Sequence, residues 1–342
     1  MDLQPVIALD IGHSACKVIA CANGRRERLL FPSVVTSAVE IAEDSAAADA
    51  LRETIEVGGR RFFFGDTAVV QGVAEAESGM AENWISHPHH QVLLLGALRK
   101  VKQAFQDLDP SKAILVLGLP AQYYSAQRNT LLSSMRNLVP GAQVVVLPQP
   151  LAPYLAIQYA IDGREDRARP VAAESWAVLE VGHFTLDVCL IAESKWVERA
   201  KGSCAGAYRL VEALAAKLSQ RIGSSVSMLE AQRALASGYV RVFGRKEDIA
   251  EDLAAARREY AEEVLEFAAM KLDRDARSLD GILVAGGGAQ LIYDRVRDRW
   301  PNATLAAHGR FDVAEGYARS GLALARDNHV RLARKATAGA SA

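Results

Sequence analysis

The sequence predicts an α/β fold of two domains built on one plan, and three observations predict it. Residues 6–20, VIALDIGHSACKVIA, form an apolar strand, a tight turn and a returning strand. Residues 176–191, WAVLEVGHFTLDVCLI, repeat this pattern about half a chain later. Residues 280–292, DGILVAGGGAQLI, form a buried type of strand that runs through three glycines into a helix. The repeat indicates a duplicated domain with a ligand held between its halves.

The first turn carries the residue types of a phosphate and magnesium site. The strand ends in Asp10, and Gly12, Ser14 and Lys17 follow it. Gly12 allows the backbone to approach a phosphate, Lys17 adds a compact positive charge, and Asp10 can hold Mg²⁺ through water. Taken alone, an ordinary hairpin whose aspartate serves the turn explains this stretch equally well.

The two later stretches strengthen the phosphate interpretation. The second stretch again places an acid before a glycine and a hydroxyl after it, as Glu180, Gly182 and Thr185. In the third, Gly286, Gly287 and Gly288 precede a helix whose first N–H groups are free to bind an anion. Three such loops in this order predict a nucleotide site.

These loops resemble those of the actin, sugar kinase and Hsp70 superfamily. Residues 10–17 resemble its first phosphate loop, residues 180–187 its second, and residues 281–288 its adenosine loop. Within the superfamily, the chain is most similar to the bacterial actin-like ATPases of the ParM/StbA plasmid-segregation family. The similarity runs from residue 6 to about residue 325 and includes residues 117–124, 146–154, 202–208 and 311–317.

The resemblance implies an actin-like ATPase fold with two ribonuclease-H-like domains. Each would have a mixed five-stranded sheet, and the sheets would flank a nucleotide cleft. We expect domain I over residues 1–162, with an inserted subdomain at about 23–85. Domain II would span residues 174–310 with a helical insert at about 212–279, and a helix over 311–335 would return to domain I.

Composition limits the class of protein. The chain has 342 residues, 40 basic and 41 acidic side chains and a net charge of −1, so it lacks the basic surplus usual in direct DNA binding. No apolar run approaches the roughly 18 residues of a membrane span, and the N-terminus lacks a basic signal-peptide region. The four cysteines show no C-x-x-C pairing, which favours a reduced cytoplasm. A buried thiol is the favoured interpretation of Cys16, ahead of a reactive one.

Residues in the expected insert have two interpretations. Gly58 and Gly59 predict a hairpin turn into residues 60–64, RRFFF. Phe62 to Phe64 fill a core or, by the resemblance, contact a neighbour in a filament; the core is favoured. The histidines at 87, 89 and 90 mark the polar start of a helix rather than a metal site, because no further ligand stands beside them.

The remaining elements follow from periodicity and turn residues. We expect helices over residues 92–105, 127–138, 208–218 and 311–334, and strands over 112–119, 143–147 and 196–200. A loop is expected over 163–173 and a turn over 202–206. Residues 227–279 should be mostly helical with a hairpin at 238–245, and residues 335–342 should form a disordered tail.

Gln149 is the candidate that orients water. Pro148 and Pro150 fix the direction of its amide, which both donates and accepts hydrogen bonds. The resemblance places there the Gln or Glu that orients the attacking water, and ParM-like proteins usually have Glu. Gln149 is a weak base, so hydrolysis would be slow. The alternative is a turn residue bonded to its own backbone.

The resemblance also implies nucleoside contacts in the second half. The turn at Gly206 would approach the sugar, and Glu212 would accept a ribose hydroxyl. Glu212 serves equally well as part of a solvated helix face. Arg258 or Glu262 would face the adenine.

The second phosphate loop departs from the family pattern, Asp-x-Gly-Gly-x-Thr-x-Asp. Glu180 stands for the first Asp, and its extra methylene would displace the magnesium or its water. His183 stands for the second Gly, and His13 has the same place in the first loop. The two histidines flank the phosphates or point outward, and the second is slightly favoured. ATP binding is therefore better supported than rapid hydrolysis.

The predicted function is a nucleotide-dependent, polymerising ATPase whose filaments segregate plasmid DNA. Partners would be copies of the chain and a centromere-binding adaptor, with DNA reached only indirectly and no membrane involved. ATP or ADP with Mg²⁺ is the expected cofactor. The catalytic candidates are Gln149, Glu180 and Asp10, of which Asp10 and Glu180 would also bind the metal. Contacts with the nucleotide are expected at Gly12, His13, Ser14, Lys17, Gly182, His183, Thr185, Gly206, Glu212, Gly286, Gly287 and Gly288.

Two other functions compete with this one. A small-molecule kinase on the same fold needs a carboxylate base, for which Gln149 is a poor substitute, and the chain is short for a sugar kinase. A non-polymerising scaffold that binds ATP only to hold its shape is favoured by Glu180 and His183.

Overall fold

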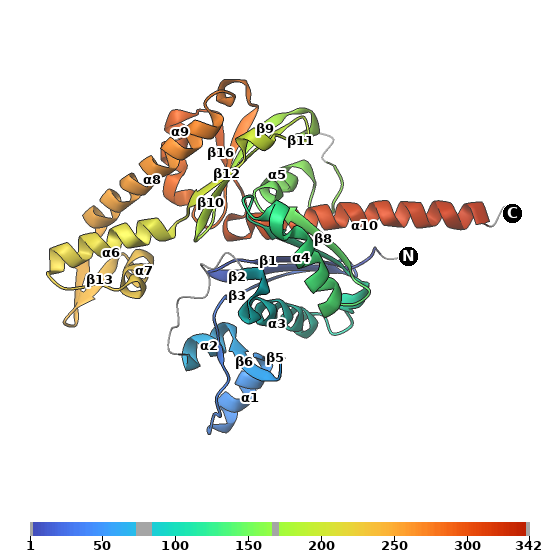
Figure 1. Ribbon diagram of the computed structural model, residues 1–342, viewed down its shortest axis with the longest axis horizontal. Coiled ribbons are helices and arrows are strands. Elements are labelled where there is room, and N and C mark those ends of the chain that lie inside the picture. The colour runs from blue at the N-terminus through green and yellow to red at the C-terminus, as the bar shows by residue number, and fades with distance from the viewer. Residues whose placement is uncertain (1–2, 73–83, 166–170, 340–342) are drawn as a thin grey trace. The chain divides into compact units, whose positions relative to one another are not determined.

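The computed structural model describes residues 3–72, 84–165 and 171–339 (Figure 1). The chain divides into two compact units. Unit 1 contains the described parts of residues 1–171 and 310–342, and unit 2 contains residues 172–309. Each unit has its own sheet and its own hydrophobic core.

Unit 1 is built on a mixed five-stranded sheet, as predicted. Its order is β3-β2-β1-β7-β8. The first three strands pair antiparallel, whereas β7 and β8 run parallel to β1. The strands are β1 (Val6–Ile11), β2 (Ala15–Ala22), β3 (Arg25–Pro32), β7 (Ile114–Leu119) and β8 (Gln143–Pro148). The carboxyl ends of β1, β7 and β8 therefore lie at one edge, where ligands of α/β sheets bind.

Helices cover both faces of this sheet because side chains of β1 alternate between them. Ile7 and Leu9 pack in the core that includes α3 (Pro88–Ala104) and α4 (Tyr124–Leu138). Val6 and Ala8 pack with α5 (Leu151–Gln158) and α10 (Asp312–Gly339) on the other face. All four side chains are 0 or 1% exposed, and burying one Leu or Ile stabilises a fold by about 1.5–3 kcal/mol.

A small sheet lies beside this core in unit 1. It has the order β4-β6-β5 and carries helices α1 and α2; the elements are β4 (Val35–Ser37), α1 (Asp44–Arg52), β5 (Thr54–Val57), β6 (Arg60–Phe64) and α2 (Gly65–Gln71). The hairpin at Gly58 and Gly59 is confirmed, since both have positive φ between β5 and β6. Phe62, Phe63 and Phe64 are at most 8% exposed and fill cores, as favoured.

The insert differs from its expected bounds of about 23–85. Residues 25–32 form β3, which pairs along its length with β2 in the main sheet, so the small sheet begins only at Val35. The sequence RRERLLFP was not predicted as part of the main sheet, because polar residues alternate along it, as they do in an edge strand with one exposed face. Residues 73–83 of the expected insert lie outside the described residues.

Helix α10 is anchored to the main sheet by a buried carboxylate. Glu315 is fully buried and accepts from Arg26 at 2.7 Å, Arg28 at 2.9 Å and Arg319 at 2.8 Å. Two of these arginines lie on β3, so the pairs join the two ends of the chain. The disordered tail expected from residue 335 is wrong as far as Gly339, because α10 continues to that residue; residues 340–342 lie outside the described part.

Unit 2 repeats the topology of unit 1. The path β11-β10-β9-β15-β16 matches β3-β2-β1-β7-β8, with β9 and β10 antiparallel and β15 and β16 parallel to β9. The strands are β9 (Ser175–Val181), β10 (Thr185–Ala192), β11 (Lys195–Trp196), β12 (Gly202–Ala205), β15 (Gly281–Ala285) and β16 (Ala303–Leu305). This sheet has six strands rather than five because β11 and β12 share the outer edge of β10.

Because β11 and β12 share the outer edge of β10, two further elements differ from the prediction. The strand expected over 196–200 ends at Trp196, and Glu198–Ala200 form a 3₁₀ turn. The turn expected over 202–206 is instead strand β12 up to Ala205. Glycine and serine in GSCA suggested a turn, but pairing with β10 decides the conformation.

Helices complete unit 2. They are α6 (Tyr208–Ile222), α7 (Met228–Ser237), α8 (Ala250–Leu272) and α9 (Ala289–Arg299), and the hairpin of β13 (Tyr239–Val242) and β14 (Arg245–Asp248) follows α7 as predicted. Ser227 and Glu230 form a capping box that starts α7. Leu210, Leu214 and Leu218 of α6 pack into the core of the unit.

Candidate functional site

The turn of unit 1 places a charge pair at the end of the sheet. Asp10 on β1 lies opposite Lys17 on β2, and the Nζ to Oδ2 distance is 3.0 Å. Their side chains are 5 and 14% exposed. Cross-strand neighbours share a face, so the strand register alone brings the two predicted residues together. The sheet end thus presents a fixed acid beside a lysine ammonium.

The backbone of this turn is held close to both groups. A Cβ on Gly12 would lie 2.7 Å from Lys17 Nζ and 3.0 Å from the carbonyl oxygen of Ala15. The Ser33 hydroxyl donates to the carbonyl oxygen of Gly12, and its oxygen is 3.2 Å from Cys16 Sγ. Ser14 is exposed at the tip of the turn. A side chain at position 12 would therefore displace the Lys17 ammonium or the turn backbone.

Cys16 is a buried structural thiol, as favoured. It is 0% exposed, and burial raises its pKa to about 12. The four cysteines are all free.

His13 and Gln149 line one hollow of unit 1. The His13 ring stacks on Trp84 at 5.5 Å, and the hollow is completed by His90 and Tyr123. Gln149 follows β8, and its N–H donates to the carbonyl oxygen of Leu119 at 2.8 Å. Burial, with a smaller effect of His13, lowers the pKa of His90 to about 3, so this histidine is neutral. Trp84 and His90 were not expected at the site, and the histidine-rich start of α3 was the signal for them.

The turn of unit 2 has two acids at the corresponding positions. Glu180 is 7% exposed and lies opposite Asp187, which is fully buried. Asp187 accepts from the Thr185 hydroxyl at 2.9 Å and from the Ser203 hydroxyl. Thr185 therefore directs its hydroxyl to Asp187 rather than outward. Asp187 and Ser203 were missed as site residues, although Asp187 stood in the repeated motif.

Predicted glycines from three segments meet at this second turn. A Cβ on Gly206 would lie 2.6 Å from the carbonyl oxygen of His183 and 2.7 Å from that of Gly182. Gly286 has φ +91°, and a Cβ there would lie 2.9 Å from Glu180 Oε1. Gly288 donates its N–H to the carbonyl oxygen of Val181 at 3.0 Å, and Gly287 between them is exposed. The structure thus brings together Glu180 and the glycines at 182, 206, 286 and 288.

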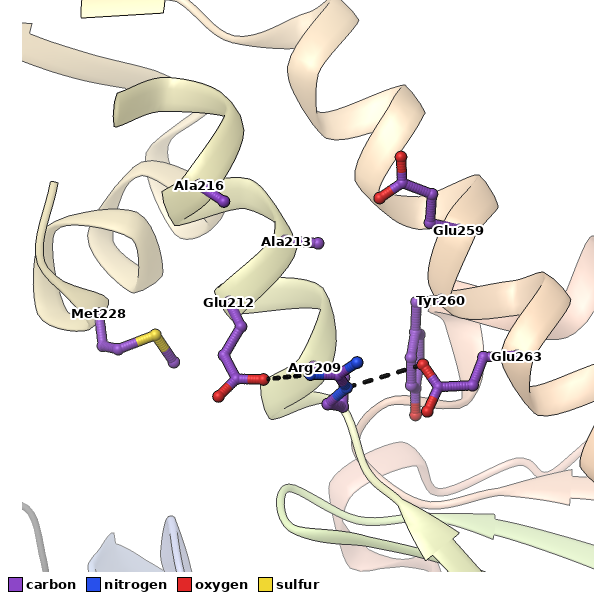
Figure 2. A pocket seen from close by; sticks show the side chains of 8 residues that line it. All are labelled: Arg209, Glu212, Ala213, Ala216, Met228, Glu259, Tyr260 and Glu263. Atoms are coloured by element: carbon purple, nitrogen blue, oxygen red, sulfur yellow. Dashed lines mark hydrogen bonds and ion pairs between the residues drawn. The ribbon is translucent and has the colours of Figure 1, made fainter. Parts of the chain in front are cut away.

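Helices α6 and α8 form a pocket of about 470 Å³ in unit 2 (Figure 2). Glu212, predicted as a ribose contact, lines it and pairs with Arg209 at 2.8 Å. Arg209 also faces Glu263 at 3.7 Å. Lining residues are Arg209, Glu212, Ala213, Ala216, Met228, Glu259, Tyr260 and Glu263.

Tyr260 is a buried polar residue of this pocket that sequence reasoning missed. Its side chain is 2% exposed, and within the described residues its hydroxyl has no hydrogen-bond partner. Burial raises its pKa well above the ordinary value. Arg258 and Glu262 do not line the pocket, and Glu262 instead lies 3.9 Å from Arg295. Either Arg258 or Glu262 was expected to face the adenine, but α8 turns Tyr260 and Glu263 toward the pocket.

Two kinds of feature are absent from the described residues. No three His, Cys, Asp or Glu side chains are grouped so as to hold a metal ion among these residues. Across the same part of the chain, no helix is both long and apolar enough to span a membrane.

Comparison with known families divides the chain as the topology does. Residues 8–151 match the family described as "Actin like proteins N terminal domain". Residues 178–298 match "Archaeal actin homologue MreB-like, C-terminal". The comparison with curated proteins gave no match.

Solved structures of actin homologues share the fold. A 15-stranded ParM filament from Clostridium botulinum is 19% identical with a TM-score of 0.71, covering 93% of this chain and 99% of that one. The archaeal actin homologue Ta0583 in complex with ADP is 19% identical with a TM-score of 0.64, covering 94 and 99%. Bacillus thuringiensis ParM with AMPPNP is 14% identical with a TM-score of 0.59, covering 95 and 99%.

The two family matches agree with the structure, which has two similar sheets, an acid–glycine turn in each and the fold of the solved actin homologues. The chain belongs to the actin-like proteins, with an actin-like N-terminal domain and an MreB-like C-terminal domain.

Proposed function

We propose that the protein is a nucleotide-dependent, polymerising actin-like ATPase that segregates plasmid DNA through an adaptor protein. One observation carries this proposal. In each of two sheets of the same order, a buried acid stands at the end of the central strand, directly before a glycine turn. Such an arrangement serves phosphate binding with a cation, and it occurs once in each unit.

The residues fit a nucleotide with Mg²⁺. A Cβ at Gly12 or Gly206 would lie 2.7 Å or less from a neighbouring atom, so both turns need glycine there, as does backbone that approaches a phosphate. Tyr260 offers a buried hydroxyl without a partner in the described part of the protein, at a pocket large enough for a nucleoside. ADP and AMPPNP are bound by two of the similar structures. Bound ATP would supply the phosphoanhydride bond, and Mg²⁺ would neutralise its charge.

In unit 1 we assign a role in nucleotide binding to each charged or polar residue of the first turn. Asp10 binds the metal through water, and Lys17 turns from Asp10 toward the β and γ phosphates. Gly12, His13 and Ser14 provide the turn that faces them. The 3.0 Å pair of Asp10 and Lys17 holds both groups ready at the sheet end.

In unit 2 we assign Glu180 to the metal or its water. Gly182, His183 and Thr185 form the second phosphate turn, in which Thr185 contributes its backbone because its hydroxyl is used by Asp187. Gly206 and Glu212 face the sugar, and Gly286, Gly287 and Gly288 hold the nucleoside. Glu212 must exchange Arg209 for a ribose hydroxyl to do so.

Gln149 orients the attacking water in this proposal. Its neighbouring prolines and its 2.8 Å backbone bond to Leu119 keep it at the sheet edge that carries Asp10. An amide positions water but takes no proton at neutral pH, so turnover is slow.

The proposed filament rests on structural similarity to other proteins, and the proposed adaptor to DNA rests on the net charge of the chain. A similar structure is a ParM filament. A net charge of −1 gives little attraction to DNA, which favours an adaptor between filament and centromere. The free cysteines fit a reducing cytoplasm.

The decisive experiment is right-angle light scattering and pelleting at micromolar concentration with Mg²⁺ and ATP, ADP, GTP or AMPPNP. We expect ATP and AMPPNP to produce filaments and ADP not to. The Gln149→Ala variant should assemble equally but release phosphate at least about tenfold more slowly, so that its filaments persist. Flat scattering at every concentration, in a protein shown to bind ATP by calorimetry, would contradict the proposal.

A second function is favoured by the unit 2 turn. Glu180 is longer than the family's Asp, and the Thr185 hydroxyl bonds Asp187 within the protein. Both features suit a scaffold that binds ATP without hydrolysing it. ATP binding with neither scattering nor phosphate release would select this function.

A further inference from the structure

The tip of the β13–β14 hairpin carries a fully exposed aromatic ring. Phe243 and Gly244 form the two-residue connection, with φ values of +46° and +83°. Phe243 is 102% exposed, so its ring touches almost nothing in its own unit. An exposed ring at the end of a rigid hairpin is a contact element rather than part of a core.

The backbone at this tip makes phenylalanine an unfavourable choice for folding. A two-residue hairpin turn with positive φ at both positions prefers Asn or Asp followed by Gly. A bulky side chain in the left-handed region costs free energy that a short polar residue avoids. The hairpin therefore keeps a ring that weakens its own turn, which indicates a role outside the folded chain.

Positive charge surrounds the ring. Arg241, Arg245 and Lys246 are all exposed on the hairpin. Lys246 and Arg241 lie over the Tyr239 ring, at 4.3 and 5.9 Å from its centroid. Glu247 and Asp248 follow on β14, so the net charge of the hairpin is +1. Its tip combines one aromatic ring with two arginines, which are residue types enriched at protein interfaces.

We propose that this hairpin docks on a second copy of the chain, where Phe243 enters an acidic, apolar hollow on the small sheet. The proposal rests on the filament function above, for which it names an assembly contact.

The hollow lies between α1 and the β4–α1 loop of unit 1 and has a volume of about 430 Å³. An apolar cavity of about 150 Å³ already holds a benzene molecule, so there is room for a phenylalanine ring. Val39 and Leu51 at the hollow are 57 and 63% exposed, and Phe63 is buried in its wall. These apolar groups would lose water when the ring enters.

The charge around the hollow complements the hairpin. Residues 38–51 contain four acids, Glu40, Glu43, Asp44 and Asp49, and no basic residue. Arg61 lines the hollow, Arg52 lies 3.7 Å from Asp49, and Arg99 donates to the carbonyl oxygens of Leu51 and Thr54, so these residues leave one net negative charge. Opposite charges speed encounter and fix orientation.

Two other hollows of the described residues suit the hairpin less well. The first, lined by Arg52, Arg99 and Lys102, would repel its cations. The second, lined by Asp294, Arg297, Asp298 and Pro301, offers little apolar surface to a ring.

The hairpin and the hollow are different surfaces of the chain, in unit 2 and unit 1, so the contact is heterologous when the same two copies do not make it in both directions. Repeated contacts of this kind build rings or open filaments rather than closed dimers.

The first test replaces Phe243 by Asn, which suits the turn but removes the ring. We expect Phe243→Asn to have an unchanged or higher melting temperature and unchanged ATP affinity. Its critical concentration for pelleting with AMPPNP should rise by roughly tenfold or more. Met270→Gln, at another exposed apolar side chain (77% exposed, on α8), is the matched control and should assemble like wild type.

The second test exchanges the charges. Arg245→Glu with Lys246→Glu should block assembly, and adding Glu40→Arg and Asp49→Arg to the same chain should restore it. Unchanged assembly of Phe243→Asn, or blocked assembly that the exchange does not restore, overturns the contact. Wild-type protein that never assembles would instead contradict the filament function.

Discussion

The turns after β1 and β9 hold the same place in two sheets of the same order, yet the residue opposite the acid differs. In unit 1 Asp10 faces Lys17, whereas in unit 2 Glu180 faces Asp187. The first pair is neutral as a whole and can bind an anion through its lysine. The second carries two acids that depend on hydroxyl donors or a cation. Repeated topology therefore does not imply repeated chemistry, and we expect the two turns to respond differently to substitution.

The largest effect should follow loss of the lysine. Lys17→Met leaves Asp10 unpaired at 4% exposure, and breaking a buried pair costs about 3 kcal/mol or more. Urea unfolding of nucleotide-free protein, followed by circular dichroism, measures this loss. The Asp10→Asn, Lys17→Met double variant removes the stranded charge and should recover most of it. A single variant as stable as wild type would show that Asp10 needs no partner.

The corresponding change in unit 2 is the matched control. Asp187→Asn keeps one oxygen that accepts from a hydroxyl, its amide group donates to the other hydroxyl, and the substitution removes the negative charge opposite Glu180. We expect a stability change within about 1 kcal/mol in the same unfolding experiment. A loss as large as that of Lys17→Met would mean that the two turns are electrostatically alike.

Replacing a glycine in each turn should give the next largest difference in stability between the two units. Gly206→Ala places a Cβ 2.6 to 2.7 Å from three backbone atoms, whereas the atom nearest a Cβ on Gly12 is the mobile end of Lys17. We expect Gly206→Ala to lower the free energy of unfolding by about 2 kcal/mol and Gly12→Ala by less. Gly12→Ala should instead weaken ATP binding, measured by calorimetry. Equal stability losses would refute this distinction.

The last effect, which is graded rather than fixed, is a pH dependence expected of unit 1. His90 has a pKa of about 3 when folded, because burial disfavours its charge, against about 6.5 when unfolded. The unfolded chain binds the extra proton between these values, so stability is full above pH 6.5 and falls as pH decreases. The contribution is about 1.4 kcal/mol per pH unit. His90→Leu should flatten the slope of unfolding free energy between pH 6.5 and 5, and an unchanged slope would assign it to other groups.

Much of the fold was predictable because short-range signals determine it. Apolar runs ending in Asp10, Glu180 and Ala285 defined the three strands, and Gly58 with Gly59 defined a hairpin. Strand β3 and the split edge of β10 were not predictable, since edge strands are half polar and their pairing depends on distant residues. The site was predictable where motif residues neighbour each other across a register, as with Asp10 and Lys17. Tyr260 escaped prediction because its exposure depends on how α8 rotates against α6.

The pairs that Glu315 makes with Arg26 and Arg28 have a consequence for synthesis on the ribosome. Unit 2 is one continuous segment, residues 172–309, whereas unit 1 uses both ends of the chain. When residue 309 has emerged, unit 2 has all its strands, but β1 and β2 still lack the α10 face that covers Val6, Ala8 and Ile19. The first strands made are thus among the last to be fully buried, and nascent chains need protection of that apolar face until α10 leaves the ribosome.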